Sequence, residues 1–121
     1  MTEEYKGRLL IVDDEDEVLV FMKRLLQNES YFVQTALSGE EALDKLKIIA
    51  PDLVILDINM PNMNGIEALR KMKEINPNLP VILSSAYQEF KQDLASWASD
   101  DYIVKSSNLD ELKEAVKRLM P

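Results

Sequence analysis

The sequence predicts an α/β fold of the (βα)5 kind, a doubly wound five-stranded parallel sheet with helices on both faces. Two observations predict it. Short apolar runs rich in β-branched residues alternate with segments whose apolar residues recur at helical spacing. Several of these runs are apolar throughout, which is typical of parallel strands buried on both faces. A length of 121 residues fits one domain with one core, so we expect a single domain over 1–121.

The expected strands are the five apolar runs, taken here in chain order. They are Leu9–Val12, Phe32–Ala36, Leu53–Leu56, Val81–Leu83 and Tyr102–Val104. The first, third and fourth are continuous rather than alternating, which favours central positions in the sheet.

The expected helices lie between and after these runs, each with an apolar stripe at helical spacing. The stripes are Val18, Met22, Leu25 and Leu26; Ala42, Leu43 and Leu46; Ile66, Leu69, Met72 and Ile75; a weaker one of Phe90, Leu94 and Trp97; and Leu109, Leu112, Val116 and Leu119. Capping signals precede three of them: Ser38 with Glu41, Asn64 with Glu67, and Asn108 with Glu111.

Two acid–lysine pairs at i,i+4 spacing support the second and third helices, Glu41–Lys45 and Glu67–Lys71. Asn76-Pro77 stops the third helix. The segment Met1–Gly7 precedes the first strand, and we expect it to be a frayed lead-in.

Composition excludes several classes of function. The chain has no cysteine and no histidine, so disulfides, thiolate chemistry, an imidazole base and phosphohistidine on this chain are excluded. A net charge of −8 argues against nucleic-acid binding by this domain and favours a cation or a basic partner. No signal peptide or apolar run of membrane-spanning length is present, so we expect no membrane contact and a cytoplasmic location.

The polar residues of interest all follow expected strands. Asp13 and Asp14 end the first strand, Asp57 the third, Ser84 and Ser85 the fourth, and Lys105 the fifth. In open parallel sheets the ligand crevice lies at the carboxyl ends of the strands, at a topological switch point. The coincidence therefore predicts a site at this edge.

Each residue taken alone has a simpler interpretation. Asp14 fits an N-cap of the first helix with Glu17 at its third position, and the acidic residues 15–17 fit the helix dipole. Ser85 fits a strand-end hydroxyl, and Lys105 a solvated lysine. Asp57 resists such a reading, since a carboxylate ending a buried central strand is costly without a partner.

Together, the carboxylates favour a cation. Three carboxylates roughly 4 Å apart repel by about 4 kcal/mol per pair at an effective dielectric constant near 20. All candidate ligands are oxygens, which points to Mg²⁺, with Mn²⁺ as a substitute.

At this point the chain resembles a response-regulator receiver domain of two-component signalling, similar to the chemotaxis response regulator. The matching pieces span the chain: Val12-Asp13-Asp14-Glu15, Asp52 through Pro61 with the D-x-N-M-P pattern, Asn64-Gly65, Ser85-Ala86-Tyr87, and Asp100 through Lys105. The resemblance implies a flavodoxin-like fold with strand order 2-1-3-4-5.

The resemblance also implies roles for site residues. Asp57 is the phospho-acceptor, and Asp13, Asp14 and Asp57 hold Mg²⁺ together with the backbone carbonyl of Asn59. Asp14 ligates most directly and Asp13 through water. Lys105 pairs with a phosphoryl oxygen.

Further roles concern the switch and the loops around the site. Ser85 donates its hydroxyl to the phosphoryl group, and Tyr102 moves inward as Ser85 shifts. Pro61 and Gly65 shape the loop after the acceptor. Asn59 and Tyr87 flank the path of the dephosphorylating water.

The implied function is a signalling switch that catalyses only its own phosphorylation and dephosphorylation. Its donor is a histidine kinase or a histidine phosphotransfer protein. Its output partner binds the face formed by the fourth helix, fifth strand and fifth helix. We expect a monomer or a weak, phosphorylation-dependent dimer, and a stand-alone receiver, with one cut from a hybrid kinase or larger regulator as the alternative.

The sequence departs from the family pattern after the lysine, where Ser106 replaces the usual proline, and in a fourth-helix region shortened by about two residues. Three rivals stay open. They are an aspartyl-phosphate hydrolase, which places D-x-D after the first strand, a pseudo-receiver that takes no phosphate, and a flavodoxin-like cofactor binder, whose phosphate the Asp13-Asp14-Glu15 run would repel.

Overall fold

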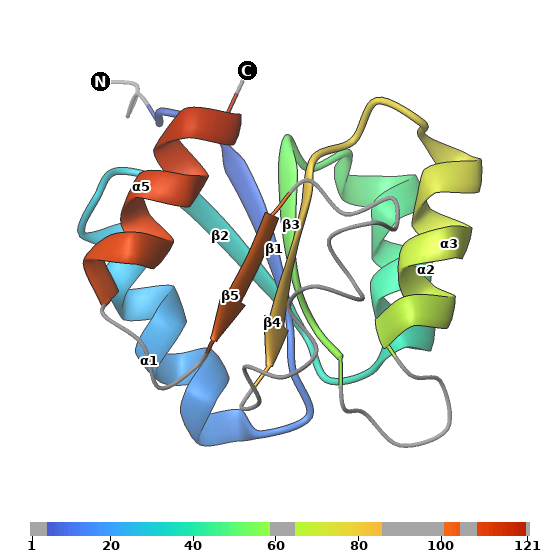
Figure 1. Cartoon of the computed structure of the whole chain (residues 1–121), viewed down its shortest axis with the longest axis horizontal. Coiled ribbons are helices and arrows are strands. Elements are labelled where there is room, and N and C mark those ends of the chain that lie inside the picture. The colour runs from blue at the N-terminus through green and yellow to red at the C-terminus, as the bar shows by residue number, and fades with distance from the viewer. Residues whose placement is uncertain (1–4, 59–64, 86–100, 105–108, 121) are drawn as a thin grey trace.

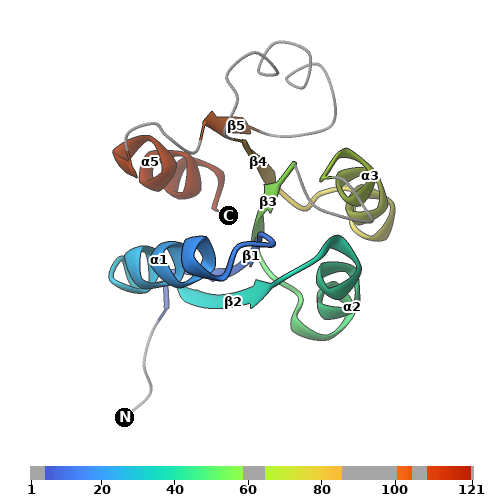
Figure 2. The same cartoon turned by 90° about the horizontal axis from the view of Figure 1, so that it is seen from below.

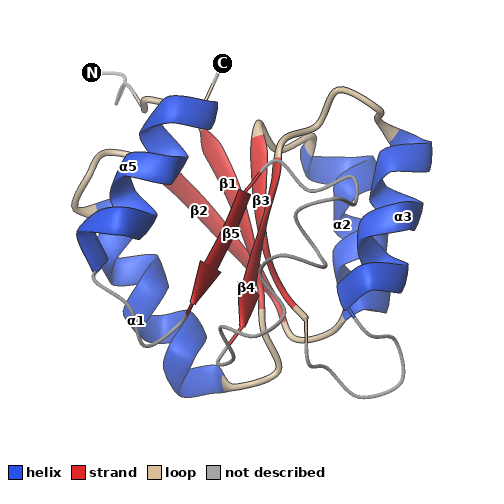
Figure 3. Ribbon diagram, viewed as in Figure 1, coloured by secondary structure: helices blue, strands red, loops and turns tan. Residues whose placement is uncertain are grey.

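The computed structural model describes residues 5–58, 65–85, 101–104 and 109–120; of Ser85 and 101–104 it gives the strand positions alone. Strands and helices alternate through most of this part (Figures 1 and 3). Their bounds are β1 Arg8–Val12, α1 Asp16–Gln27, β2 Phe32–Ala36, α2 Gly39–Ile49, β3 Leu53–Asp57, α3 Gly65–Ile75, β4 Val81–Ser85, β5 Asp101–Val104 and α5 Leu109–Leu119.

The strands form one five-stranded parallel sheet in the order β2-β1-β3-β4-β5. The predicted strand order is confirmed. Helices α1 and α5 cover one face of the sheet, and α2 and α3 cover the other (Figure 2). The prediction of a doubly wound α/β fold is therefore confirmed.

The continuous apolar runs are explained by two core clusters, one on each face of the sheet. In β1, Leu9 and Ile11 belong to the cluster that includes Leu26 of α1, whereas Leu10 and Val12 belong to the other. Successive side chains of a strand point to opposite faces. Because helices cover both faces of the sheet, the residues that point to either face are apolar, and the strand shows no alternation of polar and apolar residues.

The observed strands extend slightly beyond the predicted ones. β3 includes Asp57, and β4 includes Ser84 and Ser85, since the backbone ladder continues past the last apolar residue. Helix stripes were placed well, except that Ile75 and Leu109 are exposed.

The proposed capping role of Asp14 is wrong. Helix α1 begins at Asp16, its N-cap is Glu15, and no side chain caps it. The side chain of Asp13 instead accepts a hydrogen bond from the backbone N–H of Glu15, at 3.0 Å. The Asp13 side chain therefore makes the local side-chain-to-backbone bond at this end of the loop, and Asp14 caps no helix.

The lead-in is partly tied down. Lys6 donates its N–H to the Ser30 carbonyl at 2.8 Å, and the Gly7 carbonyl accepts from Phe32 at 2.9 Å. A Cβ on Gly7 would lie 2.4 Å from the sulfur of Met120, so the two ends of the described chain touch. The expectation of fraying is thus wrong for Lys6 and Gly7.

Some expectations concern residues outside the described part. They are the helix carrying Phe90, Leu94 and Trp97, and the caps Asn64 and Asn108. Across the residues that are described, none of the helices has the length and apolar character to cross a membrane.

Candidate functional site

Topology brings the first and third strand ends together. β1 leads outward to β2, whereas β3 leads the opposite way to β4, so the chain reverses direction between these neighbours. Val12 pairs with Leu56, which places Asp13 beside Asp57 at the carboxyl edge. This is the topological switch point at which open α/β sheets bind ligands.

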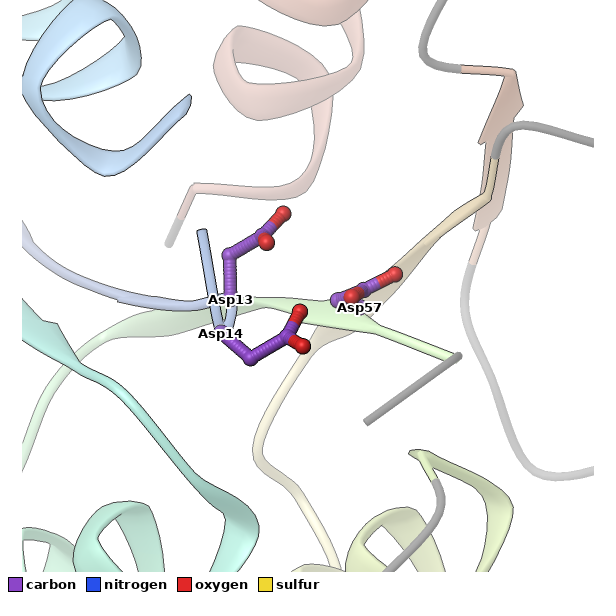
Figure 4. A group of neighbouring side chains, drawn as sticks. All are labelled: Asp13, Asp14 and Asp57. Carbon is purple, nitrogen blue, oxygen red and sulfur yellow. The ribbon is translucent and has the colours of Figure 1, made fainter. Parts of the chain in front are cut away.

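Three carboxylates meet there (Figure 4). One oxygen from each of Asp13, Asp14 and Asp57 lies within 4.8 Å of the others. Asp13 and Asp57 are each 2% exposed, whereas Asp14 is exposed. The cluster is therefore two buried carboxylates with a third on the solvent side.

Backbone contacts fix Asp13. Its N–H donates to the Ala36 carbonyl at the end of β2, at 3.1 Å. Its side chain accepts from Glu15, as described above. The residue is thereby held on one side by β2 and on the other by the start of the loop to α1.

Asp57 is the last residue of β3 and pairs with Ser84, which is buried. The next residue, Ile58, continues the ladder by donating to the Ser84 carbonyl at 3.1 Å. The position of Asp57 is therefore fixed by a central strand between two others.

Gly65 approaches the backbone of the same strand. It donates its N–H to the Ile58 carbonyl at 2.7 Å. A Cβ at Gly65 would lie 2.4 Å from the Asp57 carbonyl oxygen and 2.5 Å from the Ile58 Cα. Any side chain here would push α3 and the end of β3 apart, so the close packing requires glycine.

The donor set fits a hard divalent cation. All three side chains offer carboxylate oxygens. Two of them are buried, and repulsion between buried charges is screened less than repulsion between charges in water. A divalent ion would relieve that repulsion, and the exposed Asp14 leaves the cluster open on the solvent side.

The other predicted site residues lie on β4 and β5 or outside the described residues. Ser85 ends β4, and Tyr102 lies in β5 paired with Leu83, so both stand in strands on the Asp57 side of the sheet. Lys105 and Asn59 lie outside the described residues, together with Pro61, Tyr87 and Ser106.

Sequence reasoning missed a hydrogen-bond network beside Asp13. It treated Ser38 and Glu41 as a capping box, and Ser38 does accept from the Glu41 N–H at 3.1 Å. However, the Glu41 carboxylate accepts from Leu37 at 2.9 Å rather than from the cap residue itself. That N–H, followed by Lys45, lowers the pKa of Glu41 despite partial burial. The signal available in the sequence was a glutamate at the third helical position.

The family model of the response regulator receiver domain matches residues 9–117. This chain belongs to the response regulator receiver family. The resemblance inferred from the motifs is thereby confirmed, and the receiver is a signalling switch of two-component regulatory systems.

Curated relatives differ in how much of them the receiver spans. It is 35% identical over 116 residues to sporulation initiation phosphotransferase F of Bacillus subtilis, covering 94% of both chains. It is 36% identical over 115 residues to the transcriptional regulatory protein PrrA of Mycobacterium leprae, covering 93% of this chain but 49% of PrrA. The chain thus spans about half the length of several of these relatives.

Solved structures of response regulators share the fold of this chain. The response regulator TrrA of Thermotoga maritima in complex with Mg²⁺-BeF has a TM-score of 0.87 and 47% identity, covering 93% of this chain and 97% of TrrA. TrrA in complex with the histidine kinase ThkA gives a TM-score of 0.87 and 46% identity, covering 94% and 98%.

Proposed function

We propose that this receiver takes a phosphoryl group from a phosphohistidine donor onto Asp57, in a Mg²⁺-dependent reaction, and changes conformation to control a partner. The observation that carries the proposal is the meeting of the Asp13, Asp14 and Asp57 oxygens within 4.8 Å at the switch point. The reaction belongs to a two-component system or phosphorelay.

In the transfer step, a carboxylate oxygen of Asp57 attacks phosphorus while the bond from phosphorus to the donor's imidazole nitrogen breaks. The product is an aspartyl phosphate, and the imidazole leaves with the electron pair of the broken bond. The receiver has no histidine, so the donor is another protein or domain. Hydrolysis by an in-line water regenerates the carboxylate.

Asp13, Asp14 and Asp57 would hold the cation, with the backbone carbonyl of Asn59 as a further ligand. Bound Mg²⁺ would supply positive charge that neutralises the transferring group, and Mn²⁺ would substitute. As the resemblance implies, Asp14 would ligate the cation directly and Asp13 through water, and the proximity of their oxygens supports both roles. The Mg²⁺-BeF complex of TrrA supports the choice of metal.

Remaining roles follow the family pattern. Lys105 pairs with one phosphoryl oxygen as a point charge, and Ser85 donates its hydroxyl to another. Tyr102 moves inward as Ser85 shifts, which biases an equilibrium between inactive and active conformations. The positions of Ser85 and Tyr102 on β4 and β5, beyond β3 from Asp13, support this assignment.

The proposed phosphodonor is a histidine kinase or histidine phosphotransfer protein, which the complex of ThkA with TrrA supports. The proposed output surface is the face that includes β5 and α5. The receiver acts in the cytoplasm as a monomer or a weak dimer, and the single domain spans 1–121.

The decisive experiment measures intact mass after incubation with acetyl phosphate and Mg²⁺. Wild type should gain one phosphoryl group (about 80 Da), labile to hydroxylamine as an acyl phosphate is. Asp57→Asn should gain none while remaining folded. Asp44→Asn is the matched control, because Asp44 is an exposed carboxylate on α2, and it should behave as wild type.

Labelling of Asp57→Asn at the wild-type rate would move the acceptor elsewhere. If folded wild type gains nothing, a phosphohistidine donor replaces acetyl phosphate, and failure with both would leave the pseudo-receiver. Steady turnover of a small phosphate ester would instead favour the hydrolase.

A further inference from the structure

One peptide group joins the carboxylate cluster to helix α2. The peptide between Ala36 and Leu37 has its carbonyl and its N–H engaged on opposite sides. The Ala36 carbonyl accepts from the Asp13 N–H at 3.1 Å, and the Leu37 N–H donates to the Glu41 carboxylate at 2.9 Å. Because a peptide unit is planar, the two bonds constrain one rigid body.

The glutamate that holds this peptide is itself held. Its other carboxylate oxygen lies 3.1 Å from the Lys45 ammonium, one turn later in α2. Lys45 also donates to the Thr35 carbonyl, one residue before Ala36 in β2. Two side chains of α2 therefore hydrogen-bond two successive peptide groups at the end of β2, through the Thr35 carbonyl and the Leu37 N–H.

The contact from Glu41 strengthens the hydrogen bond at the other end of the same peptide. A hydrogen bond from an N–H to an ionised carboxylate is stronger than a neutral one, and it polarises the peptide to which the N–H belongs. The Ala36 carbonyl becomes a better acceptor for the Asp13 N–H. Asp13 and Ala36 are both nearly inaccessible to solvent, so bulk water does not replace this bond.

We propose that Glu41, braced by Lys45, is a positioning residue for the carboxylate cluster, acting through the Ala36–Leu37 peptide on the main chain of Asp13. The inference rests on the proposed metal-binding role of Asp13. Repulsion from Asp14 and Asp57 pushes this aspartate away from the site, and the tether from β2 opposes that displacement.

The test compares Glu41→Ala and Glu41→Gln with wild type. Glutamine retains a neutral acceptor for the Leu37 N–H but loses the ion pair, whereas alanine removes both contacts. Glu29→Ala is the matched control, because the Glu29–Lys113 pair has the same 3.1 Å length and Glu29 a similar exposed fraction, 39% against 41% for Glu41. Glu29 lies just before β2, at the end of the sheet where the strands begin, away from the carboxylate cluster.

Two sets of measurements are made by NMR for each protein. The first, without metal, is the scalar coupling across the hydrogen bond from the Asp13 N–H to the Ala36 carbonyl, with the hydrogen-exchange rate of that amide. The second is the Mg²⁺ dissociation constant. Glu41→Ala should weaken the coupling, speed exchange, and raise the dissociation constant on the order of tenfold, as loss of outer-shell support does in metal sites. Glu41→Gln should give a smaller change, and Glu29→Ala none.

A wild-type coupling and dissociation constant in Glu41→Ala would overturn the proposal, and so would equal losses in Glu29→Ala, which would mark general destabilisation. If Glu41→Ala does not fold, the graded effect of Glu41→Gln decides alone. If wild type binds no Mg²⁺ but the Asp13 coupling still responds to Glu41, the positioning stands and the proposed metal role of Asp13 fails.

Discussion

Gly65 contributes to the site by lacking a side chain. The close approach of its Cα to Asp57 and Ile58 lets α3 begin directly against the end of β3. The sequence resemblance assigned Gly65 to the shape of a loop. The structure supplies the reason, which is contact with backbone atoms that cannot rotate away.

Gly65→Ala should destabilise the fold by about 1–3 kcal/mol, the usual range for overpacking a tight contact. It should also slow phosphorylation, since the displaced backbone belongs to Asp57, the proposed acceptor. Urea unfolding and the acetyl phosphate assay measure the two effects. Gly39→Ala, at the first position of α2, is the matched control, because alanine is the better helix former there. Equal phosphorylation rates in the two variants would contradict the prediction.

At this scale the sequence predicted the positions of Asp13, Asp14 and Asp57 from strand ends alone. It could not predict which acidic residue occupies the N-cap position of α1, or that its side chain makes no capping hydrogen bond, because residues 13–17 are five acidic residues in a row and local rules do not rank them. Nor could it predict the contact of Glu41 with Leu37. That contact depends on how β2 meets α2 in space.

Among the elements, α2 is followed by a C-cap residue whose backbone conformation suits it poorly. Ala50 closes the helix with φ 50° and ψ 64°, in the left-handed region where glycine is usual, and Pro51 follows. Ala50→Gly should therefore stabilise the receiver by about 0.5–1 kcal/mol.

Lys47→Gly, inside the same helix, should have the opposite sign, at about 1 kcal/mol. Urea midpoints at unchanged slope measure both. A destabilised Ala50→Gly variant would mean that the loss of chain entropy outweighs the relief of strain.

Strand boundaries were predicted to within two residues. The errors share a cause: pattern analysis stops a strand at its last apolar side chain, whereas the backbone ladder includes Asp57 and Ser85. The exposed ends Ile75 and Leu109 show the same limit for helices, because a stripe at the right spacing does not reveal whether a neighbour reaches it.

For the whole molecule, metal binding at the carboxylate cluster, as proposed, would couple folding to the metal concentration. The cluster exists only when β1 and β3 are paired, so the proposed Mg²⁺ would bind the folded state and stabilise it by mass action. At a Mg²⁺ concentration ten times the dissociation constant, which we expect in the millimolar range, the gain is about 1.4 kcal/mol.

Thermal unfolding with Mg²⁺ and with chelator measures this gain. Asp14→Ala should lose most of the Mg²⁺ response and, without metal, should be no less stable than wild type, because repulsion is relieved. Asp44→Ala, on the exposed face of α2, should keep the full response. An unchanged response in Asp14→Ala would count against the cluster as the metal site.

The fold class followed from alternation and continuous apolar runs, since parallel strands must be covered on both faces. The strand order did not, because periodicity fixes elements and not their neighbours; the receiver motifs supplied it. The reversal between β1 and β3 then determines where the aspartates meet.

The contact between Gly7 and Met120 has a consequence for handling the protein. It lies at the end of the molecule where the strands begin, opposite the carboxylates (Figure 1). A short peptide could bridge the two ends, so the receiver is suited to circular permutation. Surface tethers or fluorophores attached there would lie at the opposite end of the sheet from the three aspartates.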